Sequence, residues 1–416
     1  MAVTAIANIV KTSLGPQGLD KMLVDEIGDV TVTNDGATIL KQLEVQHPAG
    51  KVIVELSQLQ DKEVGDGTTS VVILASEFLR RANALIQRGI HPTNIIQGFK
   101  MASKEACRYI KDNLCVKVET LGEDALINCA KTSMSSKMIG AESDFFAKLV
   151  VDAVKAVGMT NWRGKKRYPI KSINIVKCHG QSSLDSQLIK GYVLRLSRAC
   201  QQMPTRIENA KIACLDFNLN KFRCTLGVQV LVSKASDLGD IRAKEISILK
   251  ERVAMIIKAG ANVILTSMGI DDLAQKYLVQ AGILAVRRVD KGDLRRIAKS
   301  TGAKLLTTLA NPDGTESYDS EYLGSAKEVY EDTVGDMDYI FVKGFKNEGV
   351  CSILIRGANE FMIDEVQRSI HDSICVTKRT LESGYVVPGG GCVEIALNVY
   401  LEAYTRTLVR LSYPPV

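Results

Sequence analysis

Hydrophobic side chains recur at helical spacing through much of the first third of the chain. The segment Thr93–Leu114 is the clearest example, with apolar residues three or four positions apart: Ile95, Phe99, Ala102, Ala106, Ile110 and Leu114. Similar patterns predict a helix over Pro48–Leu59 and another that begins near Ala37. The run VVILASEFL, Val71–Leu79, is apolar on every side, which predicts a buried helix. This third is therefore predicted to be a mostly helical domain.

Strand-like apolar runs dominate the middle of the chain, from about Pro169 onward. They occur in SINIVKCHG, GYVLRL, NAKIACLDFNL and GVQVLV, and a long polar helix, Ile241–Lys258, follows them. Strands and helices then alternate in the order ANVILTS, DDLAQKYLVQAG, ILAVRRV, GDLRRIAKSTG and AKLLTTL. This alternation predicts an α/β domain with a partly parallel sheet and crossover helices. No glycine-rich nucleotide fingerprint follows its strands, so we expect a binding surface here and not a catalytic site.

The last part of the chain returns to long helices. Two strands, DYIFVKG and VCSILIRG, precede a helix whose apolar residues keep helical register from Ile363 to Leu381. The glycines Gly389–Gly391 then lead into a further apolar helix. Helical segments thus flank the central α/β domain in the sequence, which indicates that this domain is an insertion.

The sequence DKEVGDGTTS, Asp61–Ser70, places glycines, an acid and hydroxyl residues directly before an apolar run. Gly65 and Gly67 permit unusual backbone conformations and close approach of a ligand. Three hydroxyl residues follow and can cap the helix: Thr68, Thr69 and Ser70. Free N–H groups at a helix start attract phosphate. A carboxylate within a phosphate site would repel the ligand unless a cation lies between them, so Asp66 is a candidate Mg²⁺ ligand. Considered alone, an ordinary glycine turn before a capped helix explains this stretch equally well.

Four other turns carry residues of interest. The loop TSLGPQGLDKM contains Gly15 but lacks the GK[ST] ending of a Walker motif. Asp35 lies in a glycine turn after a short strand, and Gly389–Gly391 form a second loop before a helix. Lys137 ends a Thr/Ser-rich break and could contact a phosphate, although an exposed lysine in a turn is the more usual outcome. Two glycine-rich loops thus lead into helices, one at Gly65–Ser70 and one at Gly389–Gly391, and acids lie in turns elsewhere. Together they predict that both ends of the chain meet around one ligand.

Composition and charge restrict the class of protein. A net charge of +6 over 416 residues is modest and does not suggest a nucleic-acid binder. The basic run Arg163–Arg167 is more commonly a solvated loop than an anion site or a localisation signal. The ten cysteines form no CxxC pair, which is typical of reduced thiols in a cytosolic protein. Neither a signal peptide nor a bilayer-spanning apolar run is apparent, so we expect a cytoplasmic protein with no membrane contact.

Six motifs stand out together: TSLGPQGLDKM at 12–22, TNDGATIL at 33–40, EVGDGTTSVV at 63–72, KTSMSSK at 131–137, RSIHDS at 368–373 and VVPGGGCVE at 386–394. In order and spacing they resemble the motifs of group II chaperonins. The resemblance is greatest to the alpha-type subunits of the eukaryotic cytosolic ring chaperonin (TRiC/CCT). It runs from the first residues to about Tyr404.

The resemblance implies an α/β multidomain chaperonin fold. It predicts a mostly helical equatorial domain over residues 1–124 and 385–416, a small intermediate domain over 125–193 and 347–384, and an α/β apical domain that binds clients over 194–346. A helical protrusion is expected within the apical domain, at Val232–Lys250. The ending TRTLVRLSYPPV does not match the family continuation. We therefore expect a C-terminally truncated product with an incomplete equatorial domain, in which helices such as Val71–Leu79 leave apolar area exposed.

The resemblance also implies roles for residues of the glycine turns. Asp66 would bind Mg²⁺, and Asp372 would help align or activate the attacking water, with Asp35 beside it. A larger set is expected to contact the ATP: Gly15, Gly67, Thr68, Thr69, Ser70, Ser136, Lys137 and Gly390. Lys137 would also sense the γ-phosphate. Without the family, Asp372 is more simply interpreted as an exposed helical acid.

These roles imply an ATP-driven folding chaperone subunit, active in a hetero-oligomeric double ring of homologous subunits and binding unfolded clients of the actin and tubulin type. Because Asp372 would come from a separate domain, hydrolysis would depend on domain closure. One alternative is a truncated product that binds clients or partners without an ATPase cycle. Another is an unrelated ATPase or kinase, against which the absence of Walker, HRD and DFG motifs argues.

Overall fold

The structure is a computed structural model that describes residues 1–416 apart from 26, 222–234, 312, 314, 346–348 and 413–416. The chain forms two compact units. The first contains Met1–Val154 together with Asp364–Val416, and the second contains Lys155–Ile363. Both ends of the chain therefore belong to one unit, as the insertion pattern predicts. The finer division into five equatorial, intermediate and apical segments stays a prediction.

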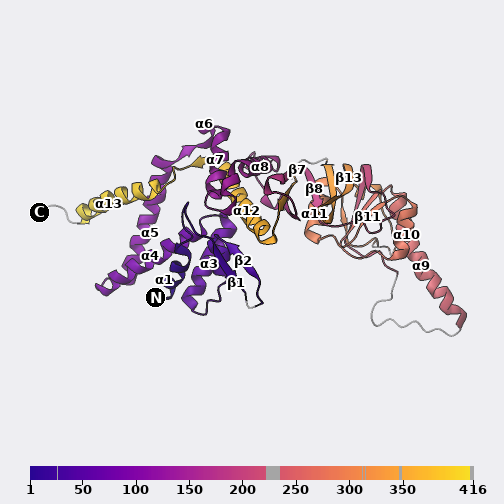
Figure 1. The fold of residues 1–416 in the computed structure, drawn as a ribbon, viewed down its shortest axis with the longest axis horizontal. Helices are drawn as coiled ribbons and strands as arrows, with labels where there is room; N and C mark the ends of the chain where they lie inside the picture. The colour runs from indigo at the N-terminus through magenta and orange to yellow at the C-terminus, as the bar shows by residue number, and fades with distance from the viewer. Residues whose placement is uncertain (26, 222–234, 312, 314, 346–348, 413–416) are drawn as a thin grey trace. The chain divides into compact units, whose positions relative to one another are not determined.

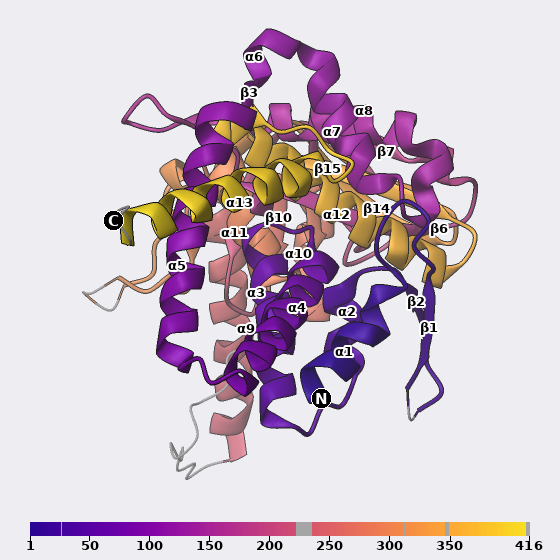
Figure 2. The same ribbon diagram turned by 90° about the vertical axis from the view of Figure 1, so that its left-hand side faces the viewer.

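The first unit consists mainly of helices (Figures 1 and 2). Its elements are α1 (Ala2–Lys11), β1 (Lys21–Val24), β2 (Val30–Thr33), α2 (Gly36–Gln42), α3 (Pro48–Glu63), α4 (Thr68–Gln87), α5 (Pro92–Tyr109), β3 (Val116–Lys117), α6 (Val118–Leu121), α7 (Glu123–Met134), most of α8 (Ser143–Ala156), most of α12 (Glu360–Ser383), β16 (Tyr385–Val386) and α13 (Cys392–Ser412). Helices α1, α3 and α4 lie side by side. One buried cluster joins them to α2: Ile6, Ala7, Val10, Ile39, Leu40, Ile53 and Val72.

Two helices of the first unit differ from the prediction. In α4 only one face is buried, through Val72, while Leu74 and Phe78 are 50% and 54% exposed. The expectation of all-round burial was therefore wrong, because too few neighbouring elements cover this helix, whereas the expectation of exposed apolar area is confirmed. The predicted Thr93–Leu114 helix ends at Tyr109, and a short π-helix, Ile110–Leu114, continues it.

The second unit is built on a mixed sheet, which confirms the predicted α/β character. Among the described residues its order is β11-β10-β9-β13-β14-β8, with β12 also paired to β9. The strands are β8 (Gly191–Leu194), β9 (Arg206–Leu215), β10 (Val263–Thr266), β11 (Leu284–Val286), β12 (Leu305–Leu306), β13 (Gly324–Val334) and β14 (Met337–Phe345). Strands β9 to β12 are parallel, and β13, β14 and β8 are antiparallel.

Helices cover both faces of this sheet. Val263 and Leu265 of β10 pack with Leu294 and Ile297 of α11 (Lys291–Thr301). The intervening Ile264 packs on the other face, against α9 (Ala235–Lys258) and α10 (Asp272–Gln280). Burial on both faces explains why these strands appear as continuous apolar runs in the sequence.

A smaller sheet in the second unit has the order β6-β15-β7: β6 (Ile173–His179), β15 (Cys351–Gly357) and β7 (Gln187–Ile189). Strand β13 was not predicted from the sequence, because its alternating charged residues hide the apolar pattern. The predicted strand GVQVLV lies outside the described residues. So does the start of the predicted protrusion Val232–Lys250, whose remainder belongs to α9. No helix among the described residues is long and apolar enough to cross a membrane.

A tight turn between α3 and α4 packs directly against α12. Gly65 has a φ of +86°, and a Cβ at this position would lie 2.3 Å from the Cβ of Cys375. Arg379 of α12 donates a hydrogen bond from Nε to the carbonyl oxygen of Glu63, at 2.8 Å. Only glycine fits both the backbone conformation and the space. The turn that carries Asp66 is therefore held against α12 at both Glu63 and Gly65.

Gly65→Ala should lower the free energy of unfolding by about 2–4 kcal/mol, because the new methyl group combines backbone strain with a clash against Cys375. The matched control is Gly89→Ala. Gly89 has the same φ of +86° but no atom within 4 Å of the added Cβ, so its loss should be only about 1 kcal/mol. Urea unfolding measures both, and equal losses would contradict the packing argument.

Candidate functional site

The first unit contains a cavity of about 550 Å³ where five loops meet the middle of α12. Its lining includes every predicted site residue: Gly15, Asp35, Asp66, Gly67, Thr68, Thr69, Ser70, Ser136, Lys137, Asp372 and Gly390. It also includes residues that the sequence did not single out: Ser13, Leu14, Pro16, Asn34, Thr132, Ser133 and Ser135. Residues from both ends of the chain thus surround one space, as predicted.

The N-terminus of α4 opens toward this cavity without a capping side chain. Its N-cap residue is Gly67, with a φ of +75° and no side-chain cap. Thr68, Thr69 and Ser70 form the first turn, and Thr68 and Thr69 are buried. The first N–H groups of a helix have no partner within the helix, and they carry the positive end of its dipole. This end of α4 is therefore suited to an anion such as phosphate.

Asp66 is fixed in the turn just before α4. Its Oδ1 accepts a hydrogen bond from the backbone N–H of Gly67 at 2.7 Å, and its Oδ2 accepts one from Ser133 Oγ at 2.8 Å. The amide of Gln60 donates to its carbonyl oxygen at 3.0 Å. Each carboxylate oxygen retains lone-pair capacity toward the cavity. Asp66 is thus held in one orientation and can still coordinate a cation.

Asp35 connects the start of α2 to the start of α4. As the N-cap of α2 it accepts hydrogen bonds from the backbone N–H groups of Ala37 at 3.2 Å and Thr38 at 2.9 Å. The hydroxyls of Thr38 and Thr68 each donate to it at 2.8 Å. Gly36 permits this proximity, since a Cβ there would lie 2.5 Å from Thr69 Oγ1. The carboxylate is therefore fixed beside the start of α4.

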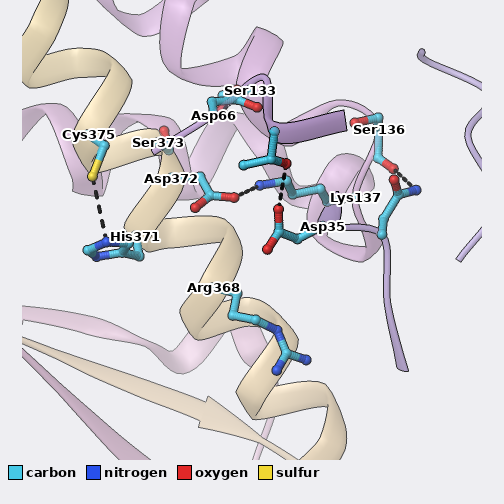
Figure 3. A network of polar contacts seen from close by, with 12 residues as sticks. Asp35, Asp66, Ser133, Ser136, Lys137, Arg368, His371, Asp372, Ser373 and Cys375 are labelled. Carbon is cyan, nitrogen blue, oxygen red and sulfur yellow. Dashed lines mark hydrogen bonds and ion pairs between the residues drawn. The ribbon is translucent and has the colours of Figure 1, made fainter. Parts of the chain in front are cut away.

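Lys137 and Asp372 form a buried ion pair between the turn after α7 and α12 (Figure 3). Their side chains are only 8% and 9% exposed. The expectation of an exposed turn lysine was therefore wrong, as was the interpretation of Asp372 as an exposed helical acid. The turn after α7 places the ammonium among carboxylates, and the side chain of Asp372 points from α12 into the same space.

The electrostatics of the pair reflect burial and an excess of negative charge. Burial raises the pKa of Asp372 to about 8, and the charges of Asp35 and Asp66 act in the same direction against the opposing effect of Lys137. For Lys137, burial opposes the charged form, but Asp372, Asp66 and Asp35 outweigh it and raise the pKa of the ammonium. Three carboxyl groups thus surround one ammonium. A further cation would be strongly attracted to this space.

Asn34 links three walls of the cavity. It is buried, and its amide nitrogen donates hydrogen bonds to the carbonyl oxygens of Gly18 at 3.2 Å and Ser136 at 3.3 Å. Together with Ser133, which donates to Asp66, it holds the loops in place. Both residues carry some signal in the sequence, because Asn34 lies within the motif TNDGATIL and Ser133 within KTSMSSK. Their partners lie far along the chain and could not be inferred.

Comparison with known proteins places these residues in a wider context. The sequence profile described as "TCP-1/cpn60 chaperonin family" matches residues 6–411. T-complex protein 1 subunit alpha of Tetrahymena pyriformis is 68% identical over 407 residues, which is 98% of this chain and 74% of the relative. The protein of the same name from Arabidopsis thaliana is 60% identical over 408 residues, covering 98% and 75%. Thermosome subunit alpha of Aeropyrum pernix is 42% identical over 410 residues, covering 98% and 73%.

Asn34→Ala should lower the free energy of unfolding by about 1–3 kcal/mol, because two partly buried carbonyl oxygens lose their donor. Asn34→Asp keeps the shape but replaces the amide donor by a carboxylate, so it should be at least as destabilising. Thermal unfolding of the two variants checks this. Wild-type stability in Asn34→Asp would show that the amide donor is not needed.

The raised pKa of Asp372 predicts a pH dependence. The folded chain holds the Asp372 proton more tightly than the unfolded chain, so this group's contribution to stability is lost as pH rises from its ordinary value of 3.8 toward about 8. Asp372→Asn does not titrate. Between about pH 5 and pH 8 the free energy of unfolding of the wild type should therefore fall relative to that of Asp372→Asn. Parallel pH profiles would contradict the raised pKa.

Proposed function

Because the chain belongs to the TCP-1/cpn60 chaperonin family and is a group II chaperonin subunit with a chaperone's function, we propose that the cavity of its first unit binds ATP with Mg²⁺ and hydrolyses it. The observation that carries this proposal is the convergence of eleven predicted residues on one space of about 550 Å³. Their chemistry suits a nucleoside triphosphate: backbone donors, hydroxyls, one ammonium and three carboxyl groups.

The phosphates would lie at the start of α4. There the backbone N–H groups of Thr68, Thr69 and Ser70 supply donors that no capping side chain occupies. Thr69 and Ser70 add hydroxyl groups, while the Thr68 hydroxyl donates to Asp35. Gly15 and Gly390 would lie against the rest of the nucleotide. Both have positive φ and no atom within 4 Å of an added Cβ, so a flat ligand can approach their backbone closely. Ser136 would add a polar contact from the opposite wall.

Asp66 would hold the Mg²⁺. In the part of the chain that the structure describes, no group of three His, Cys, Asp or Glu side chains could hold a metal by itself. A cation at Asp66 would therefore complete its coordination with phosphate and water oxygens, which is the usual environment of Mg²⁺. Bound there, Mg²⁺ would neutralise charge on the phosphates. The orientation of Asp66 set by Gly67 and Ser133 fits this role.

Asp372 would align or activate the water that attacks the γ-phosphorus, with Asp35 beside it. A general base works best when its pKa lies near the operating pH, and the pKa of Asp372 is raised to about 8. Lys137 would sense the γ-phosphate, because its ammonium is the cationic side chain held among these carboxylates. The attack would form a new O–P bond at the γ-phosphorus while the bond from that phosphorus to the β,γ-bridging oxygen breaks. ADP and inorganic phosphate would be released, and Asp372 would take up the proton of the attacking water. Positioning and charge neutralisation supply most of the catalysis in such reactions.

We propose further that hydrolysis drives a folding cycle in an assembly. The relatives are named as subunits, and we infer that this chain works in the cytoplasm within a hetero-oligomeric double ring of homologous subunits. Unfolded client proteins, including actin- and tubulin-type clients, would bind the segment 194–346, whose sheet is covered by α9 and α10 on one face. Closure that positions Asp372 would couple chemistry to movement.

The roles of the two acids can be separated by mutation. Asp66→Ala should weaken Mg-ATP binding by about tenfold or more, because a metal ligand is lost. Asp372→Ala should leave binding nearly unchanged and slow hydrolysis by about 10²–10⁴-fold, because a positioned base is lost. Calorimetric titration with Mg-ATP and single-turnover hydrolysis measure the two effects.

The control for this pair is Asp112→Ala, which removes an acid whose side chain is 64% exposed and which lies outside the cavity lining. It should leave both binding and hydrolysis unchanged. Equal loss of binding in Asp66→Ala and Asp372→Ala would contradict the assigned roles. Equal rates of ATP hydrolysis in the wild type and in Asp372→Ala would contradict the ATPase proposal for this chain.

A further inference from the structure

A small β-hairpin in the second unit has no part in the proposed ATP site. Its strands are β4 (Met159–Thr160) and β5 (Lys166–Arg167), paired antiparallel. Asn161 donates its backbone N–H to the carbonyl oxygen of Lys165 at 2.9 Å, and Gly164, with a φ of +72°, closes the turn. The hairpin is therefore a defined structural element and not an irregular loop. Every residue from 158 to 167 is exposed.

Positive charge is concentrated on and around this hairpin. The stretch from residue 153 to residue 184 contains seven lysines and arginines and no aspartate or glutamate. Four of them follow one another in or beside the turn: Arg163, Lys165, Lys166 and Arg167. The whole chain has a net charge of only +6, so the rest of it is slightly acidic. This basic stretch is thus a local feature of the chain, and it attracts negatively charged partners.

The only tryptophan of the chain lies at the tip of the hairpin. Trp162 is 86% exposed, and the guanidinium carbon of Arg163 lies 4.4 Å from the centroid of its ring. The cation–π contact holds the two side chains together. Large exposed aromatic side chains beside arginine are typical of protein interaction sites, where tryptophan and arginine contribute most of the binding energy.

A cavity of about 230 Å³ opens at the base of the hairpin. It is lined by Lys155, Gly158, Met159, Thr160, Lys166 and Tyr168. This lining contains hydrogen-bond donors and no carboxylate. The ring of Tyr168 packs closely on Gly158, where a Cβ would lie 3.0 Å from Cε1. Two lysines and two hydroxyl groups around a space of this size suit the carboxylate of a glutamate or aspartate side chain.

We propose that the hairpin 159–167 is a docking site for an acidic segment of a partner protein that carries an apolar side chain among its carboxylates. One carboxylate of the partner enters the cavity beside Lys166, others pair with Lys165 and Arg163, and the apolar side chain packs on Trp162. The small size of the surface fits a transient contact. A nucleic acid would need a basic surface that extends along its backbone, and the acidic balance of the rest of the chain does not supply one.

Trp162 makes this proposal directly measurable, because it is the sole source of tryptophan emission in the chain. The full chain is titrated with a short peptide of glutamates around one phenylalanine, and the emission of Trp162 is followed. Binding should shift the emission to shorter wavelength as water leaves the indole, and raising the salt concentration should weaken the affinity. No change in emission at any peptide concentration would overturn the proposal.

Matched charge reversals test whether the hairpin itself is the site. Lys165→Glu with Lys166→Glu should weaken peptide binding by about tenfold or more. Lys171→Glu with Lys190→Glu makes the same change in net charge at exposed positions outside the hairpin and should change the affinity by less than about twofold. Circular dichroism verifies that both variants fold. Equal losses in the two double variants would overturn the proposal, because binding would then follow net charge alone.

The same titration with single-stranded RNA of equal charge distinguishes the class of partner. The acidic peptide should bind more tightly than the RNA. Tighter binding of the RNA would overturn the proposal in favour of a nucleic-acid site.

Discussion

The ion pair between Lys137 and Asp372 is the interaction on which the candidate site depends. It joins residues 235 positions apart, from the turn after α7 and from α12, and it is almost fully buried. Burying two charges is costly, and loss of one partner from such a pair typically costs about 3–5 kcal/mol. The pair therefore constrains α12 to a position where Asp372 faces Asp35 and Asp66.

The same cavity contains one region that attracts anions and another that attracts cations. The start of α4 offers uncapped N–H groups to an anion, while the acidic side chains around the Lys137 ammonium attract a cation. A metal–phosphate ligand satisfies both demands at once, whereas a bare phosphate or a bare cation satisfies only one. Glycines at 65 and 67 make this possible, because their backbone conformations bring Asp66 to the helix start. The geometry thus selects for a complex of nucleotide and metal.

The sequence predicted much of this arrangement because local chemistry marks it. The loops were identified from glycine turns, the acids beside them and helical periodicity, and the family resemblance supplied the roles of their residues. Family membership now supports the chaperone function over both alternatives considered from the sequence. Burial of Lys137 and the one-sided exposure of α4 were not predictable, since both depend on which distant segments pack together. Asn34 and Ser133 were missed for the same reason. Strand β13 was missed because alternating charges conceal it.

We propose that the turns around Gly15, Asp35, Asp66, Lys137 and Gly390 form one Mg-ATP site together with Asp372. A structure of the chain determined with Mg²⁺ and a non-hydrolysable ATP analogue provides the decisive measurement. We expect phosphate density at the start of α4, a cation against Asp66, and Lys137 and Asp372 both facing the γ-phosphate. Nucleotide bound elsewhere, or a cavity that stays free of nucleotide at saturating concentration, would contradict it.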